Sequence, residues 1–228
     1  MQVIFYTSVK LIATRKFNMS VFHVKSSTLS RLSSLASFFE ASTPEDMRKE
    51  LNTVRLENKG GKTFAIVSNQ KIAAIEYVST TDEPDGAVHL ILSEGLLQQL
   101  FMEASSDCEM TLNTIPEMGI STMESTSGYN VSNCCHWWEP RWLDKWQTWA
   151  TEPATETIGI MAWNMNRVES LLKTSPSGNI VFPAFVDTTT PVVFRDYFNP
   201  KWVGIMFAQL TEDIKITEPA VLPEWWGV

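Results

Sequence analysis

The pattern of apolar and polar residues between Ile158 and Leu210 predicts one continuous series of secondary-structure elements. Residues 158–163 predict a strand, and residues 164–173 place apolar side chains at the spacing of a helix. Three further strand-like runs are joined by tight turns, over residues 180–186, 191–195 and 202–210. The pattern predicts one unit with the order strand, helix, strand, strand, strand.

A similar order occurs earlier in the chain, between Val21 and Val78. Residues 21–24 alternate and are rich in β-branched side chains, and they lead into a predicted amphipathic helix. The apolar positions of this helix are Leu29, Leu32, Leu35, Ala36 and Phe39. The segment Lys59-Gly60-Gly61-Lys62 is a hairpin signal between two of the strands that follow.

The pattern begins again at Val88. A strand over residues 88–92 and a capping Ser93 precede a helix over residues 94–104. The apolar face of this helix, which we expect to pack in the core, consists of Leu96, Leu97, Leu100 and Phe101. Short strands follow over residues 109–115, 119–124 and 129–132. Each such unit leaves an apolar face that another copy can cover, so we predict an α+β fold of repeated β-α-β-β-β units with the helices on one face of antiparallel sheets.

The segment between Cys134 and Glu156 breaks this order, because it holds five of the nine tryptophans and one predicted helix over residues 140–150. No hairpin is evident there, so the unit expected at this place is predicted to be truncated. The predicted parts of the chain are an N-terminal extension, or alternatively an edge strand, over residues 1–18, a first domain over 19–135, and a second, truncated domain over 136–228 that ends in an irregular tail.

The composition indicates a folded protein, since 44% of the 228 residues are hydrophobic. The three cysteines cannot all pair, and the adjacent Cys134 and Cys135 are poorly placed to bridge each other. This cysteine usage predicts a reducing, cytoplasmic compartment. No apolar run approaches the roughly 20 residues of a membrane-spanning helix, so we expect no membrane association.

Candidate catalytic and metal-binding residues do not form a coherent set. The segment Cys134-Cys135-His136 would need an orienting third group to act as a nucleophile and base. A structural zinc site needs four ligands, whereas His23, His89 and His136 are scattered. We therefore predict that the protein is not an enzyme and uses no cofactor and no metal.

Four segments of the last unit follow one another in the order and rough spacing of a known repeat: IGIMAWNMNRVESLLK, NIVFPAF, PVVFRD and VGIMFAQL. They resemble the final repeat of the sliding clamps of DNA replication, including the bacterial beta-clamp type. The first unit, FHVKSSTLSRLSSLASFF followed by LNTVRLENKGGKTFAIVSNQKIAAIEYV, is similar to an opening clamp repeat.

This resemblance implies a divergent and viral processivity factor that encircles duplex DNA and tethers a polymerase. Repeat helices would line the channel, and the partners would be duplex DNA, a DNA polymerase and a clamp loader. Encirclement holds such a protein on DNA, while weak phosphate attraction that is independent of sequence permits sliding. Since the chain has room for two domains of ordinary size, three copies would complete a ring, and we expect a homotrimer.

The net charge of −8 means that contact with DNA requires the few cations to gather on one surface. We predict that this surface is formed by cations on or beside the predicted helices. They are Lys25, Arg31, Arg48, Lys49, Arg141, Lys145, Arg167 and Lys173. The helix over residues 94–104 carries no Lys or Arg, and the alternative that these cations are ordinary solvated charges stays open.

The closing strand of the resembling repeat implies a surface that receives a partner's peptide. The residues that match this strand are Met206, Phe207 and Leu210. Trp225 and Trp226, in the proline-bounded tail, are further candidates for contact with a partner.

Two other functions stay open. The first is a non-enzymatic binding module, such as a virion or carbohydrate-binding protein, that uses its tryptophans as stacking surfaces. A monomer with exposed Trp137, Trp138 or Trp142 would favour it. The second is a clamp mimic that binds a host replication protein without forming a ring.

Overall fold

The structure is a computed structural model, and it describes residues 19–36, 52–69, 71–125, 128–135, 143, 145, 165–181 and 191–207. Several predicted features lie outside the described residues: the extension over 1–18, the strand over 158–163, most of the tryptophan-rich segment and the C-terminal tail. Among the described residues, no helix has the length and apolar character that crossing a membrane requires.

The first described elements follow the predicted order of strand, helix and three strands. They are β1 (Ser20–Lys25), α2 (Ser26–Ala36), β2 (Thr53–Lys59), β3 (Lys62–Ser68) and β4 (Ile72–Thr80). Gly60 and Gly61 form the turn between β2 and β3 with φ angles of 58° and 73°. A two-residue hairpin turn of this kind needs positive φ at both positions, which explains the glycine pair.

The next elements have the same order with one short 3-10 turn added. They are β5 (Gly86–Ile91), α4 (Glu94–Ala104), β6 (Glu109–Ile115), η1 (Pro116–Met118), β7 (Ile120–Ser125) and β8 (Gly128–Cys135). The last described elements are α6 (Met165–Thr174), β9 (Ile180–Val181), β10 (Val192–Asp196) and β11 (Trp202–Met206).

The described strands form an 11-stranded sheet in the order β1-β6-β7-β8-β5-β2-β3-β4-β11-β10-β9. The first strand of residues 20–80 pairs with a strand of residues 86–135, and the reverse also holds. Strand β1 pairs antiparallel with β6, with Ser20 opposite Thr114. Strand β5 pairs antiparallel with β2, with Gly86 opposite Asn58. Residues 20–80 and 86–135 therefore share one part of the sheet, because each segment supplies a strand that pairs with the other.

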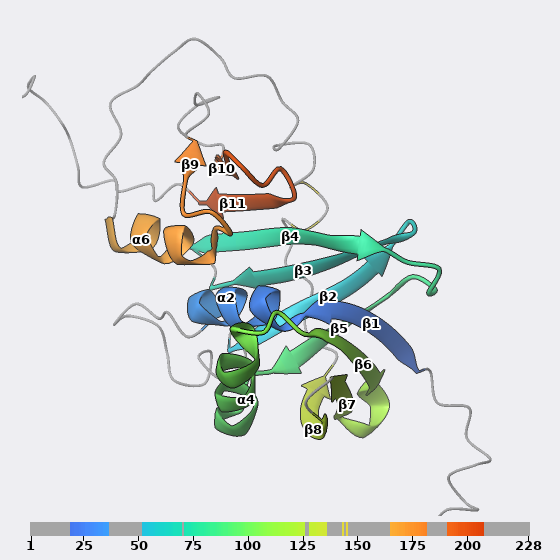
Figure 1. Ribbon diagram of the computed structural model, residues 1–228. Helices are drawn as coiled ribbons and strands as arrows, with labels where there is room; N and C mark the ends of the chain where they lie inside the picture. The colour runs from blue at the N-terminus through green and yellow to red at the C-terminus, as the bar shows by residue number, and fades with distance from the viewer. Residues whose placement is uncertain are drawn as a thin grey trace, which may run out of the picture.

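The helices lie side by side on one face of the sheet, with α2 in contact with α4 on one side and with α6 on the other (Figure 1). The apolar face of α2 points into the main core, where Leu29, Leu32 and Leu35 are fully buried. Full burial of a leucine side chain stabilises the fold by roughly 1.5–3 kcal/mol relative to exposure. The predicted helical periodicity thus sets the inward face of α2.

The opposite face of the sheet carries a second apolar cluster near β3, β4, β10 and β11. It consists of Phe64, Ile66, Ala73, Ile75, Leu143, Val193, Val203 and Ile205. Leu143 belongs to the tryptophan-rich segment, so at least this residue of that segment lies against the face that the helices leave open.

The sheet continues from the first predicted domain into the second. Strand β11 pairs antiparallel with β4, with Met206 opposite Ile72 and Trp202 opposite Glu76. The backbone N–H of Phe207 also donates to the carbonyl oxygen of Lys71 at 2.9 Å. The predicted domain boundary between residues 135 and 136 stays a prediction.

Candidate nucleic-acid interface

The outward surface of the helix row is the candidate interface, and α2 lies at its centre. This helix presents mainly hydroxyl groups, because Ser27, Ser30 and Ser34 lie on its partly or fully exposed side. The Ser34 hydroxyl donates to the carbonyl oxygen of Arg31 at 2.7 Å. Hydroxyl groups that bond to the preceding turn are typical of serine inside helices. The centre of the row is therefore polar and carries little charge.

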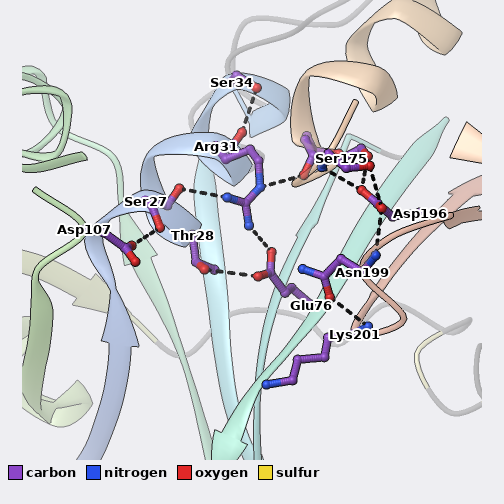
Figure 2. A network of polar contacts seen from close by, with 12 residues as sticks. Ser27, Thr28, Arg31, Ser34, Glu76, Asp107, Ser175, Asp196, Asn199 and Lys201 are labelled. Atoms are coloured by element: carbon purple, nitrogen blue, oxygen red, sulfur yellow. Dashed lines mark hydrogen bonds and ion pairs between the residues drawn. The ribbon is translucent and has the colours of Figure 1, made fainter. Parts of the chain in front are cut away.

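Arg31 is the cation of α2, and its guanidinium group joins three elements (Figure 2). Its Nε atom donates to the carbonyl oxygen of Thr174 in α6 at 2.9 Å. Its Nη2 atom forms an ion pair with Oε2 of Glu76 in β4, and the two side chains are only 18% and 9% exposed. The hydroxyl of Thr28 donates to the other carboxylate oxygen of Glu76 at 3.1 Å. Arg31 thus holds α2, β4 and α6 together, and its charge is balanced by Glu76.

Lys25 lies at the end of β1 and forms a more exposed ion pair. Its Nζ atom is 2.6 Å from Oδ2 of Asp107, and the side chains are 55% and 45% exposed. The hydrogen bond from Lys25, followed by that from the Ser27 hydroxyl, lowers the pKa of Asp107, and the same carboxylate raises the pKa of Lys25. Both groups therefore stay ionised at neutral pH, and Lys25 remains accessible to a phosphate.

Helix α6 presents one exposed cation and one buried one. Lys173 is exposed, and its Nζ atom lies 3.0 Å from Oε1 of Glu169 one turn earlier. Arg167 is buried, with 3% of its surface exposed. Because Arg31 bonds to Thr174, the end of α6 that carries Lys173 lies beside the middle of α2. Of the two predicted DNA contacts on α6, Lys173 is exposed enough to reach a phosphate, whereas Arg167 is not.

The other predicted cations are partly outside the described residues. Lys145 is exposed, whereas Arg48, Lys49 and Arg141 lie in segments that are not described. The described helix row therefore brings together Arg31 and Lys173, while Lys25 lies just before α2.

Helix α4 differs from the other two, because its outward side is uncharged apart from Glu94 near its start. Phe101 and Met102 are 79% and 71% exposed. The prediction that Phe101 packs in the core was therefore wrong. The buried positions of α4 are Leu96, Leu100 and Glu103, and a residue directly after Leu100 is rotated by about 100° from that face.

Glu103 has its side chain turned away from the outward face of α4. It is 5% exposed, and its Oε1 atom accepts hydrogen bonds from the Gln99 side chain and the Ser125 hydroxyl, both at 3.0 Å. The hydroxyl of Ser26, at the start of α2, donates to the backbone oxygen of Glu103 at 3.1 Å. The backbone of Glu103 therefore belongs to the contact between α2 and α4, whereas its carboxylate joins α4 to β7.

The predicted partner-binding residues divide between the two faces of the sheet. Met206 is buried in the main core on the helix side, whereas Phe207 is partly buried against the opposite cluster. Leu210, Trp225 and Trp226 lie outside the described residues.

Cys134, half of the cysteine pair noted in the sequence, is buried. Burial raises the pKa of its thiol to about 11. A thiol with such a pKa is protonated at neutral pH and is a poor nucleophile. Among the described residues, no three His, Cys, Asp or Glu side chains are grouped so that they could hold a metal ion.

Solved structures with the same arrangement of elements are DNA polymerase clamps. The DNA polymerase III beta subunit of Thermotoga maritima matches with a TM-score of 0.59 at 13% identity, over 82% of this chain and 65% of that chain. The sliding clamp of Pseudomonas aeruginosa, solved with a ligand, matches with a TM-score of 0.59 at 13% identity, over 83% and 66%. The chain has the fold of the DNA polymerase sliding clamps.

A putative DNA polymerase III beta subunit of Eubacterium rectale has the same clamp fold, with a TM-score of 0.61 at 11% identity, over 86% of this chain and 67% of that chain. This chain thus spans about two thirds of the length of the clamps it resembles. No protein-family model and no curated protein matches the sequence. The similarity to clamps therefore lies in the backbone arrangement. The sequence identity is too low to carry over functional residues.

The contact between Arg31 and Glu76 was not visible in the sequence. The two residues are 45 positions apart and lie on a helix and a strand. Only the helical pattern around Arg31 gave a signal, since it places this residue next to the buried face of α2. The sequence pattern could not indicate which strand lies beneath that position.

Proposed function

We propose that this protein is a non-enzymatic processivity factor that encircles duplex DNA and tethers a DNA polymerase. The observation that carries this proposal is the row of α4, α2 and α6 on one face of a continuous antiparallel sheet. Such a row gives a smooth helical wall, and closing copies of it into a ring would enclose a channel. The clamp fold supports the same function.

The proposed wall is suited to weak contact with DNA. Hydroxyl groups of α2 and scattered cations attract phosphates without reading bases, which permits sliding. We expect the exposed Lys25 and Lys173 to carry most of the salt dependence, together with Arg48, Lys49 and Arg141. Lys145 lies two residues from Leu143, which packs on the opposite face of the sheet, so we expect it to contribute less. Arg31 and Arg167 would contribute mainly to the shape of the wall, since the first is paired with Glu76 and the second is buried.

We further propose that the ring is a homotrimer that is loaded by a clamp loader in the cytoplasm. A chain with two thirds of the length of the bacterial clamps would need more copies to enclose a channel of similar width. The polymerase would dock by a peptide near Phe207, Leu210, Trp225 and Trp226. Met206 is buried in the main core and would support the strand from the other face. An origin in a virus of bacteria stays a prediction from the sequence.

Retention on circular DNA tests this function directly. The full chain would be incubated with a nicked circular duplex, a clamp loader and ATP, and bound protein would be separated by gel filtration. We expect the protein to stay on the circle and to be lost rapidly after linearisation, because an encircling ring leaves DNA by sliding off a free end. Light scattering should give the mass of three chains.

Two results would contradict the proposal. One is a strict monomer over a wide range of concentration. The other is equal retention on circular and linear DNA, which would indicate ordinary electrostatic binding. A linear duplex blocked at both ends by bound protein is the matched control, since it restores retention only for an encircling ring.

One observation favours a clamp mimic as the second candidate. The exposed Phe101 and Met102 on α4 form an apolar surface on the same wall that would line the channel. An apolar surface of this kind is more typical of a protein contact than of a phosphate contact. A monomer that co-purifies with a clamp or polymerase subunit through this surface would support the mimic.

A further inference from the structure

The turn between β10 and β11 exposes two neighbouring aromatic side chains. Tyr197 and Phe198 are each 70% exposed. Their rings meet edge to face, with centroids 4.9 Å apart and planes at 89°. Because aromatic side chains of this size are usually buried in cores or interfaces, an exposed pair marks this turn as a binding surface.

A buried carboxylate holds the turn in place from beneath. Asp196 is 3% exposed, and it accepts hydrogen bonds from the Ser175 hydroxyl at 2.5 Å and from the Ser177 hydroxyl at 2.7 Å (Figure 2). It also accepts from the backbone N–H groups of Ser177, Phe198 and Asn199 at 2.8, 2.9 and 2.9 Å. Asp196 therefore ties the turn to the segment that follows α6.

The remaining backbone N–H groups of the turn are bonded as well. The N–H of Tyr197 donates to the carbonyl oxygen of Asn179 at 2.9 Å, and that of Trp202 to the oxygen of Asn199 at 3.2 Å. The Asn199 side chain accepts from the N–H of Lys201 at 3.0 Å. The backbone is ordered before any ligand arrives, so binding at this turn loses little conformational entropy.

The exposed charges of the turn are positive. Arg195 precedes the aromatic pair and Lys201 follows it, and both are exposed. The Nζ atom of Lys201 lies 5.3 Å from the ring centroid of Tyr77 on the neighbouring strand β4. The carboxylate of this turn, Asp196, is buried and fully engaged. In the sequence of this turn, two exposed cations thus stand on either side of the aromatic pair.

We propose that the turn from Arg195 to Lys201 binds single-stranded nucleic acid, with Tyr197 and Phe198 stacking on bases and the two cations beside phosphates. Aromatic rings flanked by cations are the usual means of binding unpaired strands, because every base offers a π-face. This site is separate from the helix wall and from the docking of a polymerase.

Fluorescence anisotropy with a labelled oligo(dT) of about 15 nucleotides, within the range of known single-strand site sizes, tests the site on the full chain. We expect binding that weakens as salt is raised. Replacing both rings in Tyr197→Ala/Phe198→Ala should weaken binding by at least about 10-fold, since each stacked base contributes measurably. Met118→Ala is the matched control, because Met118 is an exposed apolar side chain of η1, outside both the turn and the helix row, and it should leave binding unchanged.

A second variant separates stacking from folding. Tyr197→Leu/Phe198→Leu keeps apolar side chains and should also lose binding, whereas its circular dichroism should match the wild type. Arg195→Gln/Lys201→Gln should lower the salt dependence and leave the rings in place.

The proposal is overturned if the wild type does not bind oligo(dT), or if the ring variants bind it as well as the wild type does. Binding of a poly-glutamate peptide in place of oligo(dT) would overturn it in favour of an acidic protein partner. Retention on circular duplex DNA does not depend on this turn, so loss of oligo(dT) binding and loss of retention report on different sites.

Discussion

Residues 20–80 and 86–135 have the same order of elements, but their helices have different surroundings. Helix α2 is joined to α6 by Arg31, and the strand β4 of its segment pairs with β11. Helix α4 carries no cation and leaves Phe101 and Met102 exposed. The same order of elements thus gives one helix whose cation bonds to two neighbouring elements and one helix that carries no cation and exposes two large apolar side chains.

This difference bears on which cations of a helix can contact DNA. Arg31 was predicted to contact DNA because of its type and its position on a helix. In the structure its guanidinium group has partners on β4 and α6, and exposure is low. A cation between two packed helices stabilises their contact first, and it reaches a ligand only if that contact leaves it accessible.

The largest expected effect comes from removing the cation that joins the helices. Arg31→Ala should lower the free energy of unfolding by about 3–5 kcal/mol, because Glu76 would be left buried and unbalanced. The measurement is chemical denaturation followed by circular dichroism. The double variant Arg31→Met/Glu76→Leu should recover most of the loss.

Lys25→Met is the matched control, because its ion pair with Asp107 is exposed and should contribute less than about 1 kcal/mol. If Arg31→Ala lowered the free energy of unfolding as little as Lys25→Met does, the stability of α2 would not depend on the buried pair of Arg31 and Glu76.

The next effect distinguishes the inner and outer sides of α4. Leu100→Ala should destabilise the protein by about 2–5 kcal/mol, because Leu100 is 1% exposed in the core. Phe101→Ala should change stability by no more than about 0.5 kcal/mol, since its side chain is exposed. Thermal and chemical unfolding of the two variants measures both changes in stability. Equal losses would mean that Phe101 is covered in solution, for example by another copy of the chain.

The smallest effect concerns the carboxylate that holds the segment after α6 against β10. Burial alone would raise the pKa of Asp196, but the hydrogen bonds from Ser175, Ser177 and Asn199 outweigh burial and lower the pKa from 3.8 to about 2. A lowered pKa in the folded state stabilises the protein above the unfolded pKa. This contribution, on the order of 2 kcal/mol, should be lost as the pH falls from about 4 to about 2.

Urea unfolding across this pH range compares the wild type with Asp196→Asn. The variant should be less stable at neutral pH and should show a weaker loss of stability on acidification. Asp107→Asn controls for the other carboxyl whose pKa is lowered. A variant with the same pH dependence as the wild type would contradict this role of Asp196.

Much of the local structure could be predicted because it depends on neighbouring residues. The helices over 26–36 and 94–104 follow from apolar spacing, and the hairpin at Gly60-Gly61 follows from the need for positive φ. The exposure of Phe101 could not be predicted in this way. Apolar spacing marks a broad face of a helix, and the position of the neighbouring elements decides which part of that face is covered.

The residue pattern of this chain was enough to determine the described helices, most of the described strands, the Gly60-Gly61 turn and the α+β class, since these depend on interactions within a few residues. The tertiary structure alone decided that β1 pairs with β6, that β5 pairs with β2 and that Arg31 meets Glu76. Such contacts join positions far apart in the chain, and their free energy appears only when the whole sheet is assembled. For the same reason the aromatic pair at Tyr197 and Phe198 became visible as a surface only in the folded molecule.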